Sequence, residues 1–234
     1  NMSSGTIKFA KVDSGTRYLQ MGAQGVHVLN DVIIDTNHNI PWASYFEAAS
    51  LDIQDGELNS YGGSDGIIIT GDLTVGNGTD NASLTYTSDS NGFHDQKFGS
   101  VTINSNGTLQ ASNQTTTITD VYSSPFALNN SGTFTHNAGT LVLNRAGNQD
   151  FVGTWTGSSA LYNLTVNCGG GTQSIRANME IEGGLIITNG NFSTHSDSHD
   201  LTVSDLITVN GGTFTTNSST INCGGIRNVG GTIA

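Results

Sequence analysis

The apolar residues of this chain recur at every second position within short segments. Leu73-Thr74-Val75, Leu164-Thr165-Val166 and Leu201-Thr202-Val203 are three examples. Residues i and i+2 of an extended chain point to the same side, so each segment predicts a strand with one apolar face. The residues between them are Thr, Ser or Asn, which suit a hydrated outer face, and Gly or Asn-Gly separates neighbouring segments at turns. The pattern therefore predicts many short strands.

The short strands accompany a repeated phrase. NGNFST at 189–194 recurs as GGTFTT at 211–216, with relatives SGTFT at 131–135 and NGTLQ at 106–110, and 22 residues separate Phe192 from Phe214. Repeats of this length stack as solenoids, because one coil cannot bury its apolar face alone. We predict an all-β fold, a parallel β-helix (β-solenoid) with short coils of about 20 residues. A β-sandwich is the alternative, but its strands have no reason to resemble one another.

The first 57 residues contain little of the repeat. We expect residues 1–57 to form an N-terminal cap or docking region and residues 58–234 to form the solenoid, with about nine coils. Trp42, Tyr45, Phe46 and Ala49 have the i, i+3, i+4, i+7 spacing of a helix, so we predict a short amphipathic helix at 41–49 that covers one end of the apolar column. Alternatively, these aromatic residues form a docking surface for a partner chain.

The charge of the chain restricts its partners. The formal net charge is −12, and the segment from Leu19 to Gln96 contains no Lys or Arg. A field of this sign repels phosphate backbones and anionic lipid, so we expect no nucleic acid partner. No apolar run approaches the ~20 residues that cross a bilayer, so we expect no membrane insertion either. We predict no cofactor; the alternative is a calcium ion recruited by the clustered acids.

The two cysteines lie in near-identical phrases, TVNCGG at 165–170 and TINCGG at 220–225. With coils of about 20 residues, Cys168 and Cys223 are two or more coils apart, which is roughly 10 Å or more. A disulfide requires Cα atoms within about 7 Å. We therefore predict two free thiols.

Two motifs match known reactive or metal-binding patterns but lack a neighbouring element or residue that the pattern requires. Gly62-Gly63-Ser64-Asp65-Gly66 matches the nucleophile-elbow pattern, but a strand follows it where the elbow requires a helix. Asp35-Thr36-Asn37-His38-Asn39 begins like a calcium loop, but Ile40 stands where the loop requires Gly. We expect neither to function as the motif suggests.

Two further clusters bear on metal binding and catalysis. His195-Ser196-Asp197-Ser198-His199-Asp200 combines imidazoles with carboxylates, yet its position between Phe192 and Leu201 favours a polar loop, and we predict no metal site. Glu180 and Glu182 are about 7 Å apart along one strand, a distance compatible with glycoside hydrolysis. Met179 and Ile181 take the inward positions, so we expect the glutamates to be ordinary outer residues and the chain to have no catalytic residues.

Residues 100 to 234 resemble the degenerate repeats of large bacterial surface adhesins and of bacteriophage tail fibres and capsid-attached fibres. The resemblance is carried by ALYNLTVN at 160–167, GLIITNG at 184–190 and DLTV at 200–203. It implies a non-enzymatic structural or adhesive module, at a virion surface or an extracellular or cell surface, that forms a homo-oligomer or larger assembly. It also implies attachment to a surface glycan, for which Trp155 and Tyr162 are the stacking candidates. A bacterial adhesin segment and a tailspike-like polysaccharide depolymerase are the alternatives.

Overall fold

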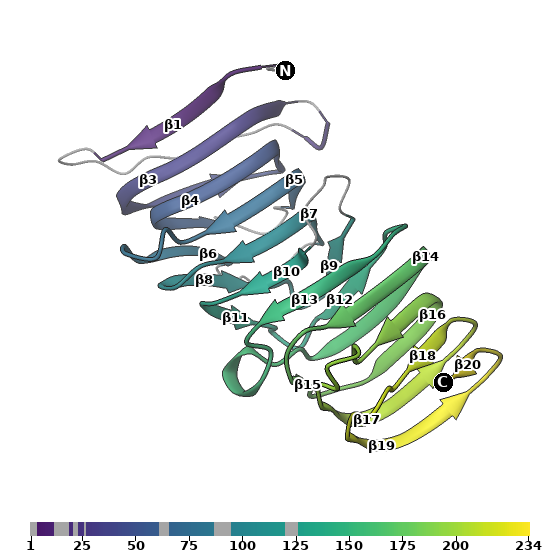
Figure 1. Cartoon of the computed structure of the whole chain (residues 1–234). Helices are drawn as coiled ribbons and strands as arrows, with labels where there is room; N and C mark the ends of the chain where they lie inside the picture. Colours follow the sequence, from purple (N-terminus) through teal and green to yellow (C-terminus); the bar gives the residue numbers. More distant parts are fainter. Residues whose placement is uncertain are drawn as a thin grey trace.

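The chain is a parallel β-solenoid. The computed structural model describes residues 4–11, 19–20, 23–25, 27–60, 66–86, 95–119 and 126–234. Coils about 22 residues apart stack into a solenoid of about nine turns with almost no helix. Figure 1 shows the coils following one another in sequence order from the upper left to the lower right, so that β1 and β20 lie at opposite ends of the stack. The predicted fold class is confirmed, and the parallel pairing excludes the β-sandwich.

Most strands have two to nine residues, whereas β3, β4 and β14 have 16, 15 and 13. Those of the N-terminal half are β1 (Thr6–Ala10), β2 (Leu19–Gln20), β3 (Val28–Ala43), β4 (Phe46–Ser60), β5 (Ile67–Val75), β6 (Ala82–Tyr86), β7 (Gln96–Ile103), β8 (Gly107–Gln110) and β9 (Thr115–Ile118). Those of the C-terminal half, with one 3₁₀ turn, are β10 (Phe126–Asn130), β11 (Thr133–Thr135), β12 (Thr140–Leu143), β13 (Gln149–Gly153), η1 (Gly157–Ser159), β14 (Asn163–Ile175), β15 (Met179–Ile181), β16 (Leu185–Ser193), β17 (Leu201–Val209), β18 (Thr213–Thr215), β19 (Ile221–Asn228) and β20 (Thr232–Ile233). In the described residues, no helix is long and apolar enough to cross a membrane.

Three parallel ladders run along the solenoid. The first is continuous from β1 through β3, β4, β5, β7, β10, β13, β14, β16 and β18 to β20. The second passes from β3 and β4 through β5, β7, β9, β12, β14, β16 and β17 to β19. The third follows β2, β3, β4, β6, β8 and β11, and resumes at β15, β17 and β19. The gap between β11 and β15 lies beside η1.

A single apolar column fills the interior. Ile34, Ile53, Val75 and Ile103 follow one another in register on four successive coils, and all four are fully buried. The outward neighbours alternate with them, as the pattern of β5 illustrates. Like residues meet because each coil repeats the same inward positions, and burial of this shared column is the main favourable contribution to folding.

The repeat phrase predicted the register between coils. Phe192 pairs with Phe214, and their rings stack with centroids 6.2 Å apart. Phe134 pairs with Leu109, which confirms that the two shorter relatives of the phrase occupy equivalent positions. Cys168 and Cys223 are both free thiols, as predicted from their separation.

The predicted helix at 41–49 is wrong. Strand β3 extends to Ala43 and β4 begins at Phe46, with a corner between them at which Ser44 has a φ of 69°. Trp42 and Phe46 flank this corner and both point into the core, where the Trp42 ring lies 5.4 Å from that of Tyr86. The apparent helical spacing therefore arises from two inward positions on either side of a turn.

The same burial rules out an aromatic docking surface. Trp42 and Phe46 have no exposed surface, and the half-buried Tyr45 packs its ring against Gly66. The ladder also continues without a break through residue 57, because β4 pairs with β3 before it and with β5 and β6 after it. Residues 28–57 thus belong to the coil stack.

Two ion pairs attach the N-terminal segment to the acidic coils. Lys8 lies 2.8 Å from Asp35, and Lys11 lies 2.9 Å from Asp55. The hydrogen bond from Lys8 holds the pKa of Asp35 below its ordinary value, and the hydrogen bond to Asp55 raises the pKa of Lys11. Both lysines are well exposed, so each pair contributes little to stability.

Candidate functional site

The gap in the third ladder brings side chains of three coils to the surface. In the third ladder, η1 stands beside β11 where a strand would continue the stack, and the next contacts are the isolated bridges of Trp155 with Met179 and of Leu161 with Ile181. The Ser159 hydroxyl oxygen accepts a hydrogen bond from the Phe134 N–H at 3.1 Å, which replaces a strand-to-strand bond.

Trp155 is a core residue, so its assignment as a glycan-stacking side chain is wrong. Its side chain is 1% exposed and lies edge-on to Phe134 and Phe151, with centroids 5.5 and 5.9 Å away. The indole N–H donates to the Val152 carbonyl at 2.9 Å. With its ring packed and its one donor satisfied, Trp155 stabilises the coil and presents no face to a ligand.

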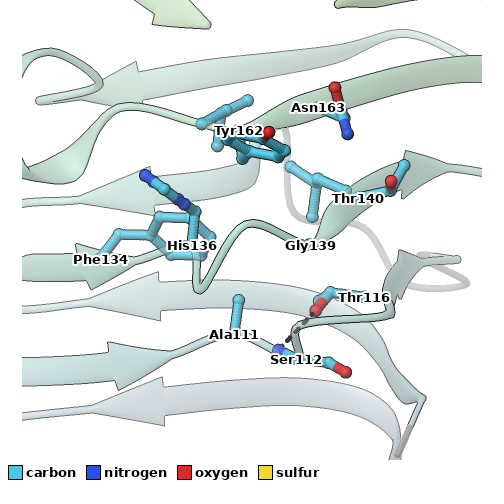
Figure 2. A pocket seen from close by; sticks show the side chains of 11 residues that line it. Ala111, Ser112, Thr116, Phe134, His136, Gly139, Thr140, Tyr162 and Asn163 are labelled. Carbon is cyan, nitrogen blue, oxygen red and sulfur yellow. Dashed lines mark hydrogen bonds between the residues drawn. The ribbon is translucent and has the colours of Figure 1, made fainter. Parts of the chain in front are cut away.

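Tyr162 lies near the surface in a cluster that we call the Tyr162 cluster, formed by His136, Tyr162 and Glu182. The half-buried Tyr162 ring stacks on the His136 imidazole, with centroids 5.5 Å apart and planes 24° apart (Figure 2). His136 Nε2 lies 3.2 Å from Glu182 Oε2. His136 Nδ1 accepts the Ala138 N–H at 2.9 Å, so the neutral ring carries its proton on Nε2 and donates it to Glu182.

The cavity beside this cluster is too small for a sugar. It has a volume of about 10 Å³, and the side chains that line it include Phe134, His136, Thr140 and Tyr162 (Figure 2). That volume holds about one water molecule. A ligand at the Tyr162 cluster therefore has to lie against the outer surface.

Glu180 and Glu182 are outer residues, as predicted. Met179 and Ile181, which alternate with them along β15, are fully buried, and both carboxylates have partners of their own. Glu180 Oε2 accepts the Gly157 N–H at 2.6 Å, while Glu182 pairs with His136. Each carboxylate is therefore oriented toward a different neighbour, and the two do not face each other across a groove.

A larger polar hollow lies on the N-terminal half of the stack. Its volume is about 390 Å³, and it is lined by Asn37, His38, Asn39, Gly56, Glu57, Asn81, Ala82, Ser83, Asn106 and Thr108. This size is within the range of ligand sites, but its lining is amide, carboxylate and hydroxyl rather than apolar. The sequence contains no motif that predicts this hollow. Asn recurs near successive turns, but the high Asn content of the chain makes such recurrence common.

The structure describes one of the two remaining motifs in full and only the last residue of the other. Asp35 and Asn39 belong to strand β3, where Asp35 pairs with Lys8, so residues 35–39 do not form a calcium loop. Of the nucleophile-elbow pattern, 62–65 lie outside the described residues, and Gly66 directly precedes β5.

Comparison of the chain with protein-family models, with curated proteins and with solved structures finds no match in any of the three.

Proposed function

We propose that the chain is a non-enzymatic structural or adhesive surface module, of the phage-fibre or capsid-decoration type or of a bacterial adhesin. The observation that supports this most is the first ladder, which is continuous from β1 to β20. Backbone hydrogen bonds along the axis and one apolar column give a stiff body whose length grows with coil number. Such a body suits spacing and presentation at a virion or cell surface.

In this proposal the Tyr162 cluster is the contact for a surface glycan. Stacking on His136 fixes the orientation of the Tyr162 ring, so little side-chain entropy is lost when a sugar packs against it. The Glu182 carboxylate beside it accepts hydrogen bonds from sugar hydroxyls, and Glu182 is half exposed. Trp155 has no part in this contact.

A glycan array tests this contact. We expect Tyr162→Ala to reduce binding of the recognised glycan about fivefold, because loss of an aromatic stacking surface costs on the order of 1 kcal/mol. Tyr162→Phe keeps the ring and serves as the matched control, with near-normal binding. Binding that survives Tyr162→Ala removes the site.

A structural subunit is the second candidate, and the apolar C-terminal coil favours it. Ile226, Val229 and Ile233 are each more than 40% exposed at that end of the stack. A subunit that assembles with its own copies associates in solution, which native mass spectrometry detects. The third candidate, a polysaccharide depolymerase, requires the release of oligosaccharide products, with loss of activity in Glu180→Gln or Glu182→Gln.

A further inference from the structure

The loop between β16 and β17 brings three metal-binding side chains together. One ligand atom from each of His195, Asp197 and His199 can be chosen so that all lie within 4.8 Å of one another. His195 Nδ1 and Asp197 Oδ2 are 3.0 Å apart. Two ligands of one zinc-type ion, each bound at about 2.0–2.1 Å, lie about 2.9–3.4 Å apart. That spacing therefore fits neighbouring ligands of one metal ion.

The loop backbone brings alternate residues to the same side. His195 and Ser198 both have left-handed φ values, 62° and 61°. Two internal bonds close the turn: Ser198 N–H donates to the His195 carbonyl at 3.1 Å, and His199 N–H donates to the Thr194 carbonyl at 3.2 Å. Neither left-handed residue is Gly, so the conformation has to be held by the surrounding structure.

Neighbouring coils hold both ends of the loop. At its start, Asn217 Nδ2 donates to Ser193 Oγ at 3.1 Å. At its end, Asp200 N–H donates to Asn178 Oδ1 at 3.0 Å, and Asp200 Oδ1 accepts the Thr220 N–H at 2.9 Å. Because the coils on both sides fix the ends, the three ligands are positioned before any ion arrives, which favours binding.

The contacts of His195 Nδ1 show which groups an ion at this nitrogen would meet. The Asp197 N–H, at 3.2 Å, and Arg176 Nη1, at 3.3 Å, are both donors and require a lone pair on Nδ1. The Asp197 carboxylate, 3.0 Å away, only accepts, and therefore opposes that lone pair. A metal ion bound at Nδ1 and Oδ2 would take this lone pair, so the Asp197 N–H and Arg176 compete with the ion for Nδ1.

We propose that His195, Asp197 and His199 bind a divalent transition-metal ion of the zinc class. Two imidazoles and one carboxylate suit Zn²⁺, Co²⁺ or Ni²⁺ better than Ca²⁺ or Mg²⁺, which prefer all-oxygen sites. Three protein ligands leave at least one coordination position for water or for a group from a binding partner. The ion would also cross-link the loop that joins two successive coils.

Titration of the intact chain with Zn²⁺ by calorimetry, and with Co²⁺ by visible absorption, tests this proposal. We expect one ion per chain and a cobalt spectrum of low coordination number. His199→Ala and Asp197→Asn should each weaken binding about tenfold or more. Neither substitution is at a left-handed residue, and circular dichroism checks that both variants keep the fold.

Two control variants and one variant that should strengthen Zn²⁺ binding complete the test. His27→Ala removes an exposed histidine elsewhere, and Cys223→Ser removes a partly exposed thiol, so both should bind Zn²⁺ as the parent does. Arg176→Gln should tighten binding, because it removes a positive charge beside His195 Nδ1. Absence of Zn²⁺ binding at micromolar concentrations, or unchanged binding in both His199→Ala and Asp197→Asn, would overturn the proposal.

Discussion

At the scale of single residues, the two thiols have nearly the same sequence context but different surroundings. Cys168 is fully buried between coils, with Sγ 3.6 Å from the Leu143 carbonyl oxygen, whereas Cys223 on β19 is partly exposed. Burial raises the pKa of the Cys168 thiol, because the thiolate loses its hydration in the core. The thiolate is the reactive form, so both burial and the raised pKa protect Cys168 from thiol reagents.

We predict that Ellman's reagent modifies one thiol of the folded chain and two thiols of the denatured chain. The fast-reacting group is Cys223, so Cys223→Ser should abolish the fast phase and Cys168→Ser should preserve it. Equal rates for the two cysteines in the folded chain would contradict the burial of Cys168.

The raised pKa also predicts how stability changes with alkaline pH. Folding favours the neutral thiol of Cys168, so its ionisation in the unfolded chain opposes folding. The free energy of unfolding should therefore fall as pH rises above the ordinary thiol value, about 8.5, toward the higher folded value. Urea titrations at pH 7.5 and 9.5, compared with the same pair for Cys168→Ser, measure this contribution. An equal fall in the two proteins would show that Cys168 is not its cause.

At the scale of elements, buried side-chain amides at the turns join successive coils. Asn130, at the end of β10, is fully buried; its Nδ2 donates to the Thr154 carbonyl at 2.7 Å and its Oδ1 accepts the Gly132 N–H at 3.1 Å. Asn104 Nδ2 similarly donates to the Gly76 carbonyl at 2.7 Å. These bonds satisfy backbone groups at corners where the ladder turns away.

We predict that Asn130→Ala lowers the free energy of unfolding by about 1–3 kcal/mol, because it removes two part-buried hydrogen bonds, one to the Thr154 carbonyl and one from the Gly132 N–H. Asn144→Ala, at an exposed position in a nearby turn, is the matched control and should change stability by less than about 0.5 kcal/mol. Urea unfolding followed by circular dichroism measures both. Similar midpoints for the two variants would show that the amide does not join the coils.

At the scale of the whole molecule, the last coil of the described stack carries exposed apolar side chains. β19 and β20 present ladder edges and the exposed side chains Ile226, Val229 and Ile233. An exposed strand edge with apolar side chains pairs readily with another chain. A second copy of this chain is the partner that the proposed assembly requires.

We predict concentration-dependent self-association that Ile226→Lys weakens, because a charge on an edge strand disfavours strand-to-strand pairing. Sedimentation velocity over a range of concentrations measures it. Ile186→Lys replaces a similarly exposed isoleucine on β16, away from the end coil, and should leave association unchanged. A monomer at all concentrations would argue against a homo-oligomer formed through this end.

Local patterns were sufficient to predict the solenoid and much of its register. Alternating segments such as Leu164-Thr165-Val166 specify strands because the pleat has a period of two. The repeated phrase specifies stacking, and Phe192 therefore meets Phe214. The separation of the cysteines and the outward placement of Glu180 and Glu182 follow from the same two periodicities.

Only the tertiary structure determined which residues gather at the surface. Trp42 and Phe46 have a helical spacing, but they lie on either side of a corner between two strands. Trp155 lies in a turn after β13, where the alternation of apolar and polar residues does not predict which side chains are buried. His136 reaches Tyr162 and Glu182 across three coils, and the ligand atoms of His195, Asp197 and His199 converge through two left-handed residues. The sequence by itself determined the repeating coil, because periodicity is local. Contacts at the turns depend on loop lengths and on how each coil sits upon the next, which only the folded stack decides.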